Sequence, residues 1–97
     1  MKHSDVIVIG SGVAGMTAAL ASAQQGKSVT LLTYGASSLS LNSGLIDILA
    51  YDDNHKAVKS PIEGLKQLPA DHPYSKIGAD YVEKAVDFFR AFAKKYH

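Results

Sequence analysis

The sequence predicts an α/β fold that begins with a strand–helix–strand unit whose two strands are parallel. A strand is expected over 5–9, in which residues 6–9 form an apolar, β-branched run of the kind that is buried on both faces of a parallel sheet. Three glycines follow at Gly10, Gly12 and Gly15, with the spacing G-x-G-x-x-G. A second β-type run over 28–33 completes the length that a right-handed crossover between parallel strands needs.

Size and composition limit the class of protein. A chain of 97 residues that is 46 % hydrophobic and 20 % charged is expected to form one compact unit around a modest core. Its net charge of +1 comes from ten basic and nine acidic residues spread along the chain, so no basic stripe indicates nucleic acid. Without cysteine it has no disulfide or thiolate site. No metal site is expected either, because the four histidines lie far apart in the sequence: His3, His55, His72 and His97.

The helix of the predicted unit spans 13–25, is rich in alanine, and stops at Gly26. The following segment, 35–44, consists mostly of small and hydroxyl-bearing residues and leaves the carboxyl end of the second strand, where parallel sheets bind ligands. Two interpretations of this segment stay open. It contacts a cofactor ring or phosphate, or it is a flexible serine-rich connection.

The second half of the sequence predicts a β-hairpin and helices. Runs at 45–50 and 56–58 flank a polar turn, and Asp47 within the first run is either catalytic or simply on the solvent face. A short helix is expected from Ser60 to Leu68, with Ser60 as its N-cap and a capping glutamate at Glu63; residues 71–74 are expected to be extended. A final helix over 80–96 carries an apolar face made of Tyr81, Val82, Ala85, Phe89, Phe92, Ala93 and Tyr96.

The glycine motif predicts a phosphate-binding loop of the Rossmann-like, dinucleotide-binding type. The first glycine allows a sharp turn off the strand, the second leaves room for a pyrophosphate, and the third lets the helix pack close to the strand. The backbone N–H groups of residues 12–15 have no partners inside the helix, and the helix dipole adds positive charge there, so they can hold a phosphate. The alternative is a tight turn that binds no ligand.

Thr33 departs from the usual dinucleotide-binding pattern. That pattern has an aspartate or glutamate at the end of the second strand, where it bonds a ribose hydroxyl, and here Thr33 and Tyr34 follow Leu32. The missing carboxylate argues against NAD or an ordinarily held adenosine, and the absence of a nearby arginine argues against NADP. A nicotinamide-binding domain therefore remains only an alternative.

A secretory leader is a second interpretation of the N-terminus. Lys2 and His3, the apolar stretch 6–20 and the sequence Ala-Ser-Ala at 21–23 imitate a signal peptide and its cleavage site. Asp5 interrupts the basic start, and glycines at dinucleotide-loop spacing occupy the apolar part. These features favour the binding loop over the leader.

Two further motifs carry a resemblance to a known family. Ser43-Gly44-x-x-Asp47 and His72-Pro73-Tyr74-Ser75, taken with the glycine loop, resemble the N-terminus of the flavoprotein B subunit of anaerobic glycerol-3-phosphate dehydrogenase. The likeness covers most of the chain, and a threonine at position 33 also fits that subunit.

The resemblance implies a flavin-dependent oxidoreductase subunit that carries FMN, or alternatively FAD. It implies electron transfer from glycerol 3-phosphate toward quinone in anaerobic respiration, together with a catalytic FAD subunit and an iron–sulfur membrane-anchor subunit. The complex would lie in the cytoplasm, held at the inner face of the cell membrane by its partner subunits. No catalytic residue is assigned, and the cofactor-binding residues are expected to be Gly10, Ser11, Gly12, Val13, Ala14, Gly15, Thr33, Ser43 and Gly44.

The same resemblance makes residues 1–97 the N-terminal part of one flavin-binding Rossmann-like domain whose later strands are missing. Such a piece is expected to be inactive alone and to self-associate through unpaired strand edges. The competing interpretation is a module for subunit assembly without a cofactor, which uses the aromatic face of residues 81–96.

Overall fold

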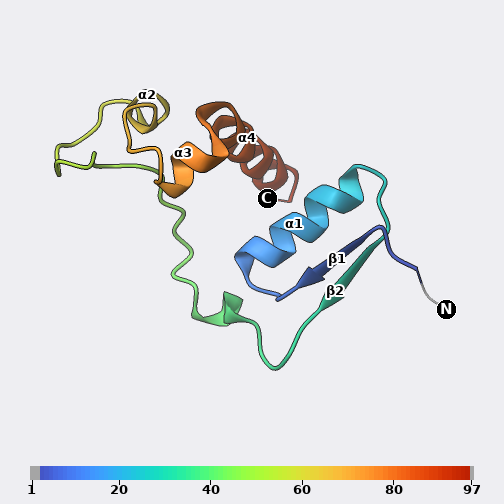
Figure 1. The fold of residues 1–97 in the computed structure, drawn as a ribbon. Helices are drawn as coiled ribbons and strands as arrows, with labels where there is room; N and C mark the ends of the chain where they lie inside the picture. Colours follow the sequence, from blue (N-terminus) through green and yellow to red (C-terminus); the bar gives the residue numbers. More distant parts are fainter. Residues whose placement is uncertain (1–2, 97) are drawn as a thin grey trace. The chain divides into compact units, whose positions relative to one another are not determined.

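A computed structural model describes residues 3–96 of the chain (Figure 1). The chain divides after Leu45 into two compact units, residues 1–45 and 46–97. Composition predicts one compact unit, and the structure instead has two, each with its own secondary structure. None of the helices in the described part of the chain is long and apolar enough to span a membrane.

The first unit contains a small parallel sheet with one α-helix. Strand β1 (Val6–Ile9) leads into helix α1 (Val13–Gln24), and strand β2 (Val29–Leu32) follows. The strands pair in parallel, with Val6 opposite Val29 and Ile9 opposite Leu32. This arrangement is a partial Rossmann-like α/β unit, as the sequence predicts, with each element one or two residues shorter than expected.

Hydrogen bonds extend the strand pair beyond both ends of β1. Before the strand, the Asp5 N–H donates to Ser28 Oγ at 2.9 Å, and the Ser28 N–H donates back to Asp5 Oδ2 at 3.0 Å. After the strand, the Gly10 N–H donates to the Leu32 carbonyl at 2.8 Å. The glycine loop therefore begins while it is still tied to the end of β2.

Helix α1 approaches the end of β1 very closely at Gly15. A Cβ atom added to Gly15 would collide with the carbonyl group of Gly10 and would lie 3.5 Å from Val8 Cγ1. Backbone atoms cannot move aside as the end of a flexible side chain can. The third glycine of the motif predicts this close approach between helix and strand.

Only one face of β1 is shielded within the first unit. Val6 and Val8 are half-buried, whereas Ile7 and Ile9 are exposed, Ile9 to 83 %. The sequence run predicts burial on both faces, and this expectation is wrong for the described residues. The reason is that α1 is the one α-helix of this unit, so it covers only one side of the two strands.

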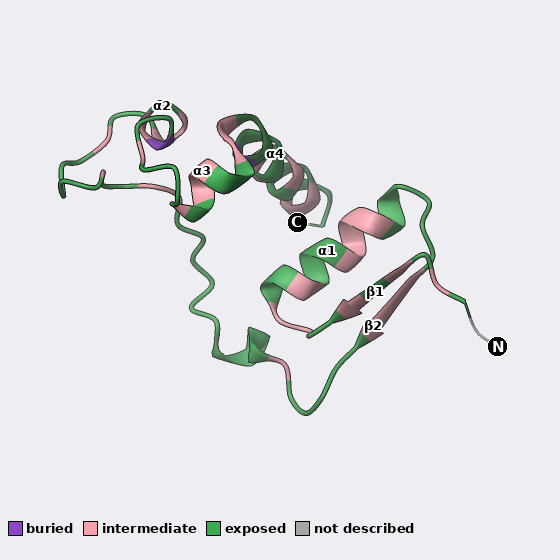
Figure 2. Ribbon diagram, in the orientation of Figure 1, coloured by how far each residue is buried: buried purple, intermediate pink, exposed green. Residues whose placement is uncertain are grey.

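The second unit is helical. Helix α2 (Pro61–Leu65) and helix α3 (Pro73–Ile77) each pack against the longer helix α4 (Ala79–Lys95). Leu65 and Val82 are the two buried hydrophobic residues of the described chain (Figure 2). At Gly64 an added Cβ would lie 2.9 Å from Val58 Cγ1, which shows how closely α2 packs on the segment before it.

The hairpin expected over 45–58 is reduced to a single antiparallel bridge between Tyr51 and Ala57. Asp52 organises the turn, because its Oδ1 accepts the N–H groups of Asn54 at 2.8 Å and Lys56 at 2.9 Å. A hairpin of two short strands with no third strand beside it is only marginally stable in water. A polar turn closed by one bridge therefore forms in place of a two-stranded hairpin.

Helix α3 begins inside the stretch 71–74, which the sequence predicts to be extended. His72 is indeed extended, as residues before proline are, but Pro73 occupies the first helical position. His72 Nδ1 accepts the Tyr74 N–H at 3.1 Å and so caps the helix. The proline therefore starts a helix here.

Helix α2 is shorter than expected and lacks the predicted capping box. It ends at Leu65, and only turns continue to Leu68. Ser60 occupies the N-cap position but makes no side-chain capping bond. Glu63 instead pairs with Lys66 Nζ at 3.2 Å, in an exposed contact that contributes little stability.

Replacing Gly15 by alanine is expected to destabilise the first unit by about 1–3 kcal/mol, because the new methyl group meets backbone that must shift. Thermal unfolding followed by circular dichroism measures the loss. Ala18→Ser adds one atom at an exposed position of the same helix and serves as the control, with an expected cost of about 0.5 kcal/mol. Equal costs for the two variants would contradict the close approach at Gly15.

Leu65→Ala is expected to cost about 2–5 kcal/mol, because it empties a fully buried position next to α4. Leu41→Ala makes the same chemical change at a residue that is 88 % exposed and is expected to cost less than about 0.5 kcal/mol. Urea unfolding of both variants tests the assignment of the core. The assignment fails if Leu65→Ala is no more costly than its control.

Candidate functional site

The glycine loop delivers a set of free backbone amides. Gly10 has φ +106°, a conformation that favours glycine, and Gly12 is the extended N-cap of α1. The first bond of the helix runs from the Met16 N–H to the Gly12 carbonyl at 2.9 Å. The N–H groups of residues 13–15 therefore have no acceptor within the helix.

The electrostatics at this end of α1 favour an anion. The helix dipole places partial positive charge at its N-terminus, and no acidic side chain lies in the first turn to neutralise it. A phosphate oxygen is a suitable acceptor for several N–H groups at once. These backbone N–H donors can hold an anion without a lysine or arginine side chain.

The serine-rich segment folds back onto the glycine loop. A Cβ added to Gly12 would lie 2.9 Å from the hydroxyl oxygen of Ser38, the first residue of the 3-10 helix η1 (Ser38–Leu41). The glycine motif predicts a pyrophosphate in the space beside Gly12. In the structure, the Cβ side of Gly12 faces the Ser38 hydroxyl.

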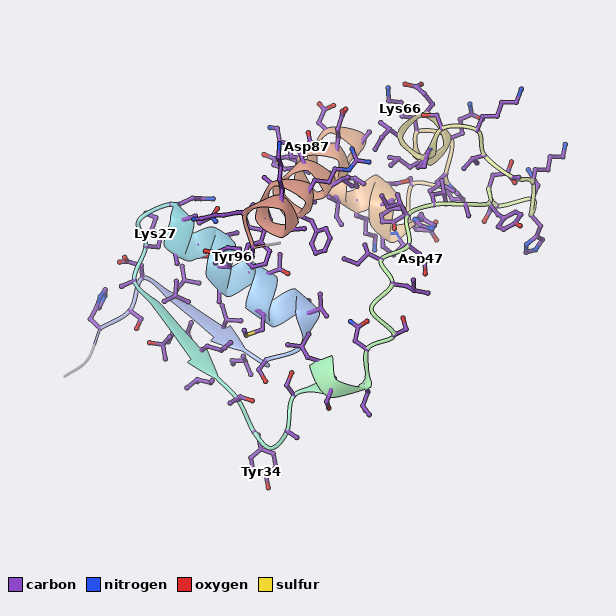
Figure 3. All side chains as sticks on the ribbon, turned by 180° about the vertical axis from the view of Figure 1, so that it is seen from behind. Lys27, Tyr34, Asp47, Lys66, Asp87 and Tyr96 are labelled. Carbon is purple, nitrogen blue, oxygen red and sulfur yellow. The ribbon has the colours of Figure 1, made fainter. Side chains whose placement is uncertain are left out.

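Ser11 is held at two points by the segment that follows β2. Its hydroxyl lies 2.8 Å from the Thr33 hydroxyl, and its carbonyl oxygen accepts a hydrogen bond of 2.5 Å from the Ser37 hydroxyl. Thr33 therefore contacts the glycine loop from the place where other dinucleotide-binding proteins carry a ribose-binding acid. Tyr34, the next residue, is exposed and points away from the sheet (Figure 3).

Ser43 and Gly44 lie apart from this cluster in their hydrogen bonding. Ser43 Oγ accepts the Leu45 N–H at 3.2 Å, and the Gly44 N–H donates to Asn42 Oδ1 at 2.9 Å. Both residues are exposed. The structure thus joins the glycine loop to Thr33, and no hydrogen bond within residues 3–96 joins that loop to Ser43 or Gly44.

Ser37 and Ser38 belong to the site although the sequence does not single them out. Their only signal in the sequence is membership of the hydroxyl-rich segment 35–44. Which serine of that segment reaches the loop depends on the path of the chain after β2. Ser37 is half-buried, whereas its neighbours from Leu32 to Gly35 are exposed.

The second unit contains an apolar pocket of about 480 Å³ between residues 46–48 and the helices α3 and α4. Asp47 and Arg90 are the charged residues of its lining. Asp47 is exposed, and nothing in its hydrogen bonds marks it as an acid or base (Figure 3). No cluster of three potential metal ligands occurs in the part of the chain that the structure describes.

Comparison with known proteins identifies the kind of ligand. A family model described as FAD binding domain matches residues 5–97. A protein of Halobacterium salinarum, named as the probable B subunit of anaerobic glycerol-3-phosphate dehydrogenase, is 43 % identical over 95 residues, which cover 97 % of this chain and 22 % of that protein. The B subunit of anaerobic glycerol-3-phosphate dehydrogenase from Vibrio cholerae is 42 % identical over 93 residues, which cover 93 % of this chain and 21 % of that protein.

The resemblance found in the sequence is confirmed by these relatives, and the chain spans about a fifth of their length. No solved structure matches the chain. The family description names FAD, the cofactor that the resemblance gave beside FMN. Since the match covers both the glycine loop and the second unit, the chain belongs to the FAD binding domain family.

Proposed function

We propose that this chain holds the phosphate portion of FAD in the B subunit of an anaerobic glycerol-3-phosphate dehydrogenase. One observation carries the proposal: the free amides at the N-terminus of α1 follow a glycine loop in a chain of the FAD binding domain family. The relatives that match nearly the whole chain are named as this subunit.

The residues present suit a phosphate group. Adding a side chain at Gly15 would move α1 off the strand, and α1 offers three amide donors with no carboxylate in its first turn to compete. We assign the cofactor contacts to Gly10, Ser11, Gly12, Val13, Ala14, Gly15, Thr33, Ser43 and Gly44. Bound FAD would accept the electrons of the oxidation, and these residues would bind and orient it.

Thr33 weakens the usual contact to an adenosine ribose, which NAD and FAD share, so the choice of FAD rests on the family match. The Thr33 hydroxyl bonds the Ser11 hydroxyl and carries no negative charge, so it holds a ribose hydroxyl less strongly than a carboxylate does. In our proposal the adenosine ribose is therefore held weakly from this side, and FAD affinity comes from contacts elsewhere.

For the whole protein we propose electron transfer from glycerol 3-phosphate toward quinone. The relatives are each named as one subunit of a dehydrogenase, which supports the existence of partner subunits. We propose a catalytic FAD subunit and an iron–sulfur membrane-anchor subunit, which would hold the complex at the cytoplasmic face of the cell membrane.

A second function, subunit assembly, is favoured by the exposed aromatic residues of α4. Tyr81 is 65 % exposed, Phe89 is 45 % exposed, and both line the apolar pocket of the second unit. Apolar surface of this kind commonly marks a contact site. Assembly and FAD binding use different parts of the chain and are tested separately.

The full-length protein is expected to purify yellow, to bleach with dithionite and to release FAD that mass spectrometry identifies. Titration with NADH is expected to show no micromolar binding, because Thr33 offers no ribose-binding carboxylate and the family that matches the chain is described as binding FAD. A colourless full-length protein that takes up neither FAD nor FMN would end the proposal and leave assembly as the function.

The isolated 97-residue chain is expected to bind FAD with a Kd weaker than about 1 μM in calorimetry. A helix N-terminus contributes at most about 2 kcal/mol to an anion, and micromolar binding needs roughly 8 kcal/mol. The remaining contacts must come from outside the glycine loop. Submicromolar FAD binding by this chain alone would refute the claim that most of the binding energy comes from contacts outside the glycine loop.

A further inference from the structure

We propose that Ser37 is a positioning residue that sets the direction of the Gly12 N–H through the peptide group between Ser11 and Gly12. The Ser37 hydroxyl donates to the Ser11 carbonyl oxygen at 2.5 Å and accepts the Leu39 N–H at 3.1 Å. The Ser37 hydroxyl therefore acts as a donor and as an acceptor at the same time. This inference rests on the proposed function, because it matters only if FAD phosphate meets the loop.

The planarity of the peptide bond links the two groups. In a trans peptide the carbonyl and the following N–H lie in one plane and point in opposite directions. Holding the Ser11 carbonyl toward Ser37 therefore turns the Gly12 N–H to the opposite side. A hydroxyl 26 residues away thus controls a donor that it does not touch.

Gly12 is the residue at which such control is needed. Glycine occupies positive and negative φ almost equally, so the peptide before it can rotate at little cost. A rotated peptide would present a carbonyl oxygen where the N–H had been and would repel a phosphate. The Ser37 bond keeps the observed orientation, with Gly12 at φ −71° and ψ −175°.

Thr33 supplies the second restraint on Ser11. Its hydroxyl lies 2.8 Å from the Ser11 hydroxyl, so Ser11 is held through both its carbonyl and its side chain. The two restraints differ in kind. Only the Ser37 bond acts on the peptide group itself, whereas the Thr33 bond acts on the side chain.

The test compares FAD affinity and thermal stability of the full-length apoprotein among matched variants. Ser37→Ala is expected to weaken FAD binding roughly three- to tenfold, as expected for the loss of one hydrogen bond. Ser40→Ala is the control, because the Ser40 hydroxyl donates only to the Ser37 carbonyl within its own turn, at 3.1 Å. We expect it to change affinity less than about twofold.

Two further variants separate positioning from a merely structural role. Ser37→Thr keeps the hydroxyl at an extended residue that tolerates β-branching, and we expect it to restore the affinity. Ser11→Ala removes the Thr33 contact and leaves the carbonyl bond, so we expect a smaller loss than for Ser37→Ala. The apo unfolding temperatures of Ser37→Ala and Ser40→Ala are expected to agree.

The outcomes distinguish this inference from the proposed function. Wild-type protein that binds no FAD refutes the proposed function. Wild-type protein that binds FAD while Ser37→Ala binds it equally well refutes the positioning role alone. The role is also refuted if Ser37→Thr folds and fails to restore the affinity. It is refuted as well if Ser37→Ala and Ser40→Ala lose the same amount of FAD affinity and of apo unfolding temperature.

Discussion

The contact between α1 and the end of β1 determines the geometry of the first unit. Because Gly15 lies directly against the Gly10 carbonyl, the chain must turn within a few residues and start the helix at the carboxyl end of the strand. That placement brings the unpaired amides of α1 to the edge of the sheet where parallel α/β folds bind ligands. The close approach at Gly15 thus sets both the packing of α1 on the strand and the position of its unpaired amides.

Within residues 3–96, hydroxyl groups, and no charged side chains, make the side-chain hydrogen bonds between the glycine loop and the segment after β2. Ser11, Thr33 and Ser37 form a connected set between the glycine loop and the segment after β2. Each bond is neutral and individually modest, and their effect is to restrict a loop that glycine makes flexible. These bonds restrain the glycine loop through geometry, without any charged side chain.

The sequence predicts the parallel unit well because its signals are local. A β-branched run, three spaced glycines and an alanine-rich helix each indicate their own structure, and α1 ends within a residue of its expected bound. Pro73 gives an ambiguous signal, since proline both breaks and begins helices and only the cap at His72 decides between them. The expected hairpin rested on a polar turn between two short β-type runs, with no third strand to support them. The roles of Ser37 and Ser38 depend on contacts between residues 26 positions apart, which spacing does not encode.

Our central proposal is that the backbone amides following the glycine loop hold FAD phosphate. Hydrogen–deuterium exchange of the full-length protein, with and without FAD, tests it most directly. We predict that FAD slows exchange in the segment spanning residues 10–16 and leaves the Tyr51–Ala57 turn unchanged. FAD binding that leaves exchange in residues 10–16 unaltered would contradict the proposal.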